Sequence, residues 1–341
     1  AREVRLFRNL PAIRWQYRVH EQIQPAIEAI GGIIRDSGIA IHHLGYTTKA
    51  EQKRKTNRNL RLLELDLVAR PSDVFILYYL GFSYLELGRF DEAADYLERA
   101  HQQSVLPPSV GPRVYVLLTR ALLRLDRRED ARRWCHEGLR RYPRDTELAF
   151  IEGEFRLDAG DMSGAESLFR TILQGETELA EASFDPDLCG YKARHSLATA
   201  CGPNRPREQE ELWRAVVQDQ PGFLPAWLSL GELFIAEARW KDAEPIVQVV
   251  ENCSPERPEA AILKARLLAA RGEFRQAKDT LRKYLSGHPD AVHPRIVLAQ
   301  VILREGRDRD AAERAIAGVL TRQPNHPEAL RLRQLLVRWH R

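Results

Sequence analysis

The stretch LPAWLSLGELFIAEARWKDAEPIVQVVENCSP, residues 224–255, contains the pattern that decides the fold. A small residue, Gly231, lets one helix approach the next, Ala243 lets the second helix pack back, and Pro255 stops that second helix. The stretch therefore predicts a pair of helices joined by a tight turn. Its apolar or small positions are Trp227, Leu230, Gly231, Phe234, Ala243, Val247, Val250 and Pro255.

The same pattern recurs along the chain with a regular period. Pro221, Pro255 and Pro289 are each 34 residues apart, and Pro324 follows after 35. The stretch DVFILYYLGFSYLELGRFDEAADYLERA, residues 73–100, repeats the apolar and small positions. These stretches resemble tetratricopeptide repeats, which implies a mainly α-helical protein, an α-solenoid of about seven helix-turn-helix repeats in which each unit contacts its neighbours. The predicted units span residues 74–107, 112–145, 146–184, 190–223, 224–257, 258–291 and 292–325, and residues 326–341 form a predicted capping helix.

Composition sets limits on the class of protein. The chain has 341 residues, a net charge of +4 and a hydrophobic fraction of 44%, enough for a sizeable core. The four cysteines show no metal-ligand spacing, so we expect free thiols and a cytoplasmic, reducing location. No apolar run approaches the roughly 20 residues of a transmembrane helix. Because the chain opens on Ala1 and contains a single Met, we expect it to be part of a longer protein.

The segment before the repeats follows a different pattern. The stretches EVRLFRN (3–9) and IRWQYRVHE (13–21) alternate apolar and polar residues with period two, and IAIHHLG (39–45) reads similarly, so three short strands are predicted. The stretch QPAIEAIGG (24–32) predicts a short helix ended by glycines. Residues 1–48 are thus predicted to be a small α/β remnant of a larger domain, residues 49–73 a basic connecting helix, and residues 74–325 the repeat array.

Four short motifs in this segment occur in a recognisable order: RLFRN, VHEQI, HLGY and KRKTNRNLRLLE. Followed directly by repeats, they resemble the C-terminal end of family 2 glycosyltransferases. The resemblance implies an A-type nucleotide-sugar fold, a nucleotide-sugar donor, a divalent Mn or Mg ion, and a polypeptide or other acceptor or partner held by the repeats. The Asp-x-Asp motif of that family is absent, since DPD (185–187) and DRD (308–310) fall in predicted turns.

The resemblance also suggests site residues. His20 would be a metal ligand, Glu21 a catalytic carboxylate, and Arg5, Arg8 and His43 would contact substrate or diphosphate. Structural alternatives stay open for each of them: His20 as a polar strand residue, Glu21 as the first residue of a helix, Arg5 and Arg8 on a solvated strand face, and His43 at a strand-to-helix junction.

Two classes of function follow from these patterns. The first is the C-terminal part of a nucleotide-sugar-dependent glycosyltransferase, inactive as this piece alone because its donor site is missing. The second is a non-enzymatic repeat scaffold for protein–protein interaction, with the first 70 residues as a structural cap. Nucleic-acid binding is not expected, because the basic residues of the connecting helix are accompanied by no aromatic stacking platform.

Overall fold

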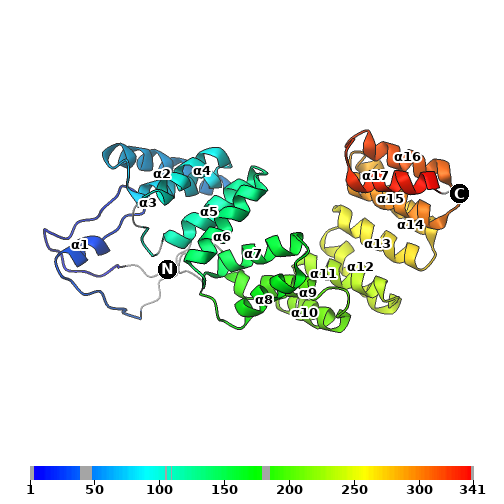
Figure 1. Cartoon of the computed structure of the whole chain (residues 1–341), viewed down its shortest axis with the longest axis horizontal. Helices are drawn as coiled ribbons and strands as arrows, with labels where there is room; N and C mark the ends of the chain where they lie inside the picture. Colours follow the sequence, from blue (N-terminus) through cyan, green and yellow to red (C-terminus); the bar gives the residue numbers. More distant parts are fainter. Residues whose placement is uncertain (1–3, 39–47, 104–105, 109, 179–184, 339–341) are drawn as a thin grey trace. The chain divides into compact units, whose positions relative to one another are not determined.

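The computed structural model describes residues 4–38, 48–103, 106–108, 110–178 and 185–338. Within them the regular structure is helical (Figure 1). The elements are α1 (Gln24–Ala29), α2 (Lys49–Ala69), α3 (Val74–Glu86), α4 (Phe90–His101), α5 (Gly111–Arg124), α6 (Arg128–Arg141), α7 (Thr146–Asp158), α8 (Met162–Leu173), η1 (Pro186–Cys189), α9 (Tyr191–Cys201), α10 (Pro206–Asp219), α11 (Leu224–Ala236), α12 (Trp240–Cys253), α13 (Pro258–Ala270), α14 (Phe274–Gly287), α15 (Val292–Glu305), α16 (Arg309–Leu320) and α17 (Pro327–Arg338).

The helices fall into pairs that match the predicted units. We call the first helix of each pair the A helix (α3, α5, α7, α9, α11, α13, α15) and the second the B helix (α4, α6, α8, α10, α12, α14, α16). The chain divides into an N-terminal unit, residues 1–193, and a C-terminal unit, residues 194–341. The prediction of an α-solenoid built from repeated helix pairs is confirmed.

Small residues allow the close approach of A and B helices, as the sequence predicted. A Cβ on Gly81 of α3 would lie 2.5 Å from Cγ of Leu97 in α4. A Cβ on Gly231 would lie 2.8 Å from Cδ2 of Leu263 and 3.3 Å from Cγ2 of Ile246. All three distances are shorter than ordinary carbon–carbon contact, so a larger residue at either position would push the helices apart.

Each unit has its own apolar core between neighbouring helices. In the N-terminal unit a continuous cluster runs from α2 to α7 and includes the fully buried Leu63, Leu80 and Leu97. In the C-terminal unit a cluster runs from α13 to α17 and includes Ala277 and Ile302. None of the helices among the described residues is long and apolar enough to cross a membrane.

The predicted α/β remnant is wrong in the part of residues 1–48 that the structure describes. Residues 4–22 form no strand, and their backbone pairing is one isolated antiparallel bridge between Gln16 and Gln22. Tyr17 and His20 both have positive φ, 69° and 55°, which breaks an extended strand. The predicted helix is confirmed as α1. The third predicted strand, 39–45, lies outside the described residues.

The alternation of apolar and polar residues predicted a strand, but the segment that carries it is bent and forms no strand. Ile13 and Val19 are buried, but Trp15, which would lie on the same face of an alternating strand, is 49% exposed. His20, which would lie on the opposite face of such a strand from Tyr17, packs against the same helix as Tyr17. With no neighbouring strand in the described residues to complete a ladder, side-chain packing decides the backbone path.

The basic connecting helix is α2, which begins with a capping box. The side chain of Thr48 accepts a hydrogen bond from the backbone N–H of Glu51, and the Glu51 carboxylate accepts one from the backbone N–H of Thr48. Leu60 and Leu63 are buried in the core cluster that includes α3. α2 therefore packs against α3 in the same way as α4 packs against α5 and α6 against α7.

Candidate interaction surface

Two consecutive A helices of the N-terminal unit, α5 and α7, are joined by a buried ion cluster. Arg113 of α5 donates from Nη1 to Oε2 of Glu147 in α7, and from Nη2 to Oδ2 of Asp145 at 3.2 Å. The side chains of Arg113 and Glu147 are both 0% exposed. Arg120 of α5 reaches the same Oε2 of Glu147 at 3.8 Å. Consecutive A helices are thus fixed to each other by charge pairs with little access to water.

Asp145 has two roles in this cluster. Besides accepting from Arg113, its Oδ1 accepts the backbone N–H of Leu148 at 2.9 Å, which caps the first turn of α7. Burial raises the pKa of the Asp145 carboxyl, and the Leu148 hydrogen bond and Arg113 act in the opposite direction. The ion pair and the helix cap therefore depend on one carboxylate.

Side chains near this cluster remain partly exposed along the A helices. Arg113 and Arg120 are two helical turns apart, so they lie on the same side of α5, and this side faces α7. Residues at equivalent repeat positions, and those one turn later, continue that surface on α3, α5 and α7. We call this set the A-helix face: Phe82, Leu85, Arg120, Leu123, Glu154 and Leu157.

The A-helix face combines apolar and charged groups. Leu123 is 37% exposed, Phe82 and Leu85 are half-buried, and Glu154 is exposed. Exposed apolar side chains next to an arginine on a rigid surface are typical of protein interfaces. Such a surface can bind an extended segment through contacts with several helices.

The predicted metal ligand His20 belongs to a bent segment that packs on α2 and α3. We call residues 13–23 the arm. The His20 ring stacks on the Tyr79 ring with centroids 3.8 Å apart and planes inclined by 4°. Burial, reinforced by Lys55, lowers the pKa of His20 to about 4, so the imidazole is neutral near pH 7.

Polar contacts also hold the arm. The backbone N–H of Arg18 donates to Oδ2 of Asp66 at 2.8 Å, and its guanidinium donates to Oδ1 of the same carboxylate. The Tyr17 hydroxyl donates to Oδ2 of Asp73 at 3.1 Å. The guanidinium of Arg70 lies 4.3 Å from the centroid of the Tyr17 ring. The arm is therefore an ordered part of the N-terminal unit.

The other predicted site residues are not brought together around His20. Arg5, Arg8 and Glu21 are exposed, and His43 lies outside the described residues. Among the residues that the structure describes, His20 belongs to no group of three His, Cys, Asp or Glu side chains close enough to share an ion. The described side chains around His20 do not complete a site for a Mn or Mg ion, so we derive no metal-dependent step there, and the roles of these residues stay predictions.

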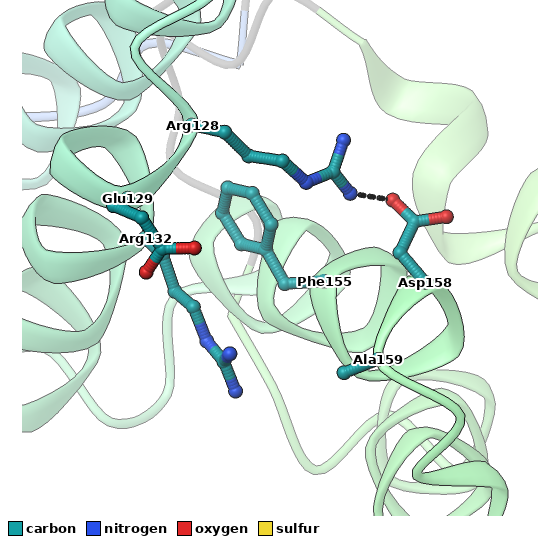
Figure 2. A pocket seen from close by; sticks show the side chains of 6 residues that line it. All are labelled: Arg128, Glu129, Arg132, Phe155, Asp158 and Ala159. Carbon is teal, nitrogen blue, oxygen red and sulfur yellow. Dashed lines mark hydrogen bonds and ion pairs between the residues drawn. The ribbon is translucent and has the colours of Figure 1, made fainter.

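An open notch lies between α6 and α7. It has a volume of about 430 Å³ and is lined by Arg128, Glu129, Arg132, Phe155, Asp158 and Ala159. Figure 2 shows the Phe155 ring between the side chains of Arg128 and Arg132, with Arg128 donating to Asp158. The acidic and basic groups of the lining balance, so the notch does not select a ligand by charge.

The buried ion cluster was not predicted, although the spacing of its residues in the sequence indicates it. Arg113 and Glu147 are 34 residues apart, one repeat period, so they occupy equivalent positions on consecutive A helices. The same spacing separates Glu232 and Arg266 of the C-terminal unit, where Nη1 of Arg266 lies 2.5 Å from Oε1 of Glu232. Opposite charges separated by one period therefore predict ion pairs between adjacent repeats.

Comparison with known proteins identifies the repeats. Models of the tetratricopeptide repeat match residues 74–104, and residues 117–186 and 262–327. A TPR repeat-containing protein of Pseudomonas aeruginosa is 30% identical over 98 residues, which make up 29% of this chain and 16% of that protein. The chain thus spans only a small part of this relative.

Solved structures share the fold. A tetratricopeptide repeat protein from Parabacteroides merdae superposes with a TM-score of 0.64 at 12% identity, covering 77% of this chain and 98% of the other. PilW, a type IV pilus biogenesis factor, gives 0.55 at 15% identity, with 67% and 98% covered. A structure of the APC/C hetero-tetramer Cut9–Hcn1 gives 0.55 at 12% identity, with 82% and 52% covered. The helix pairs and these matches show that the chain has the fold of tetratricopeptide repeat arrays, and the sequence matches that repeat over residues 74–104, 117–186 and 262–327.

Proposed function

We propose that this chain is a scaffold that binds an extended polypeptide segment of a partner protein on the A-helix face. The observation that supports it is the row of partly exposed Phe82, Leu85 and Leu123 beside Arg120. A rigid surface loses little conformational entropy when a segment binds to it. The buried pair of Arg113 and Glu147 supplies this rigidity by holding α5 and α7 together.

The side chains of the face suggest how the segment is held. Phe82 and Leu123 offer apolar contact area on two different A helices, so a bound segment has to cross from one repeat to the next. Arg120 lies beside Glu147 and is partly exposed, so it adds a positively charged guanidinium to the face, which suits carbonyl or carboxylate acceptors of a ligand. The expected ligand is therefore an extended segment with apolar side chains and backbone or side-chain carbonyl acceptors.

A selection followed by affinity measurements tests the proposal. Peptides are selected from a random library on the immobilised chain, and their affinities are measured by isothermal titration calorimetry. Leu123→Ala and Phe82→Ala should each weaken binding about tenfold, because truncating a central apolar contact costs more than about 1 kcal/mol.

Leu335→Ala is the matched control. Leu335 is also an exposed leucine, but it lies on α17 of the C-terminal unit. Its replacement should leave the affinity unchanged. Equal losses for Leu123→Ala and Leu335→Ala would contradict the assignment of the A-helix face.

The glycosyltransferase hypothesis is a second candidate, favoured by the ordered motifs within residues 2–66. The repeat matches begin at residue 74, so they give no support to it. In this hypothesis His20 would contact a divalent ion bound to the nucleotide-sugar diphosphate. Its test is nucleotide-sugar hydrolysis by the full-length protein with and without Mn²⁺, in the parent and in His20→Ala. Equal metal-dependent rates in the two proteins would exclude a metal role for His20.

A further inference from the structure

The arm fills a site on the N-terminal unit that a repeat helix would otherwise occupy. Each of α5 and α7 packs against the A helix before it, whereas α3 is the first A helix. In the described structure, Tyr17, Val19 and His20 cover the side of α3 that no preceding A helix covers. The arm is a short peptide-like segment that completes the end of the stack.

The site under the arm has a defined set of walls. Its lining is Leu63 of α2 with Phe75, Ile76 and Tyr79 of α3, and we call these four residues the α3 slot. The three arm side chains leave no space for a water molecule between themselves and the slot. Complementarity of this kind requires specific side chains at each arm position.

Each arm residue has a distinct contact. Tyr17 lies against Phe75 with ring centroids 6.0 Å apart and reaches Asp73 through its hydroxyl. Arg18 pairs with Asp66, whose side chain is 3% exposed. His20 presents a flat ring to Tyr79. The pattern that the slot accepts is thus aromatic, basic, aliphatic, then a flat ring.

The arm adopts this arrangement at a conformational cost. Two of its four central residues, Tyr17 and His20, are in the left-handed region without being glycine. A separate peptide that reaches the same contacts with a relaxed backbone would avoid this cost. The side-chain contacts with the slot, and not the covalent connection of the arm to the chain, therefore determine which segments the slot accepts.

We propose that the α3 slot is a recognition site for polypeptide segments with the aromatic–basic–aliphatic–ring pattern, and that the chain's own arm occupies it until such a segment displaces it. This site is separate from the A-helix face, so the inference goes beyond the proposed function. The expected partner is a protein segment that carries a tyrosine-like residue, an arginine, a branched aliphatic residue and a flat ring in succession.

The experiment uses a labelled peptide with the sequence IRWQYRVHEQI, which is that of residues 13–23. Its affinity is measured by fluorescence anisotropy for the parent chain and for the arm variant Tyr17→Ser/Val19→Ser/His20→Ser. The arm variant should bind at least about tenfold more tightly, because the parent slot is occupied in most molecules. Equal affinity for the two proteins, or no binding to a folded arm variant, would overturn the proposal.

Two further variants on the arm-variant background locate the binding. Tyr79→Ala removes the stacking surface of the slot and should weaken binding about tenfold, whereas Phe82→Ala changes the A-helix face and should leave it unchanged. Loss of binding by Phe82→Ala alone would assign the peptide to the other surface and overturn the slot. Failure of the slot is thereby distinguished from failure of the proposed function.

If circular dichroism shows that the arm variant does not fold, hydrogen exchange on the parent decides. The backbone N–H groups of Gln16 and Gln22 are bonded to each other's carbonyls, and that of Arg18 is bonded to Asp66. Unlabelled peptide should accelerate the exchange of these three amides and leave those of α13 unchanged. Unchanged exchange at all three amides in the presence of saturating peptide would refute displacement of the arm.

Discussion

Replacing Arg113 with Met tests how the A helices are held in line. The change removes the cation that pairs with both Glu147 and Asp145, and all three side chains are at most 4% exposed. The two carboxylates then lose their shared buried cation, and the partly exposed Arg120, 3.8 Å from Glu147, is the cation that remains beside them. Breaking a buried ion pair in this way costs about 3–5 kcal/mol, so the free energy of unfolding of the N-terminal unit should fall by about that amount.

The double variant Arg113→Met/Glu147→Leu separates the ion pair from the loss of side-chain volume. It removes the buried Arg113–Glu147 pair, so one carboxylate, Asp145, instead of two is left without its buried cation. Asp145 keeps its helix cap through Leu148 in both variants. The double variant should therefore be more stable than Arg113→Met alone by at least about 2 kcal/mol.

Hydrogen exchange of individual backbone amides is the assay for these variants. Repeat arrays can unfold in parts, so a single global transition would combine the unfolding of the N-terminal and C-terminal units. The free energy of opening is measured for backbone amides in α5 and α7. A matched surface variant is Arg133→Met, which removes a largely exposed arginine paired with Asp130 and should change stability by less than about 1 kcal/mol. A loss below 1 kcal/mol for Arg113→Met, or additive effects in the double variant, would refute the buried-pair argument.

Other predictions concern helix packing and pH. Gly153→Ala should destabilise the N-terminal unit by about 1–3 kcal/mol, because its Cβ would lie 2.6 Å from Cζ of Phe169; in thermal unfolding, Gly222→Ala, with no heavy atom within 4 Å, is the control. Burial lowers the pKa of both His20 and His195 to about 4. As the pH falls, each of these histidines takes up a proton in the unfolded chain at a higher pH than in the folded chain. The free energy of unfolding is therefore largest above about pH 6.5 and falls by roughly 3 kcal/mol per histidine as the pH drops to 4. Urea unfolding across this range should show the loss, and His195→Gln should remove its share; a pH-independent midpoint would contradict the assignment of neutral buried rings.

The repeat part of the fold could be predicted from the sequence because its constraints are local and periodic. Gly81 and Gly231 mark where A and B helices approach, and Pro255 marks the end of a B helix. Each rule depends on residues within one repeat. A single sequence was therefore enough to place the helix pairs.

The N-terminal segment was predicted less well because its structure depends on residues far along the chain. Tyr17, Arg18 and His20 take their positions from Asp73, Asp66 and Tyr79, about 50 to 60 residues later. Alternation alone could not distinguish a strand from an arm that packs on a helix. The partner segment that we propose for the A-helix face likewise leaves no mark on the periodicity of the sequence, so it has to be found by experiment.

Photo-crosslinking tests the central claim most directly. A peptide selected on the chain is synthesised with benzoylphenylalanine at one apolar position and irradiated in complex with the parent protein. Mass spectrometry then identifies the attached residues. Attachment to α3, α5 or α7 at residues of the A-helix face, lost when Leu123 is replaced by Ala, is the predicted result. Attachment to the B helices α4, α6 or α8, unchanged by that replacement, would contradict the account.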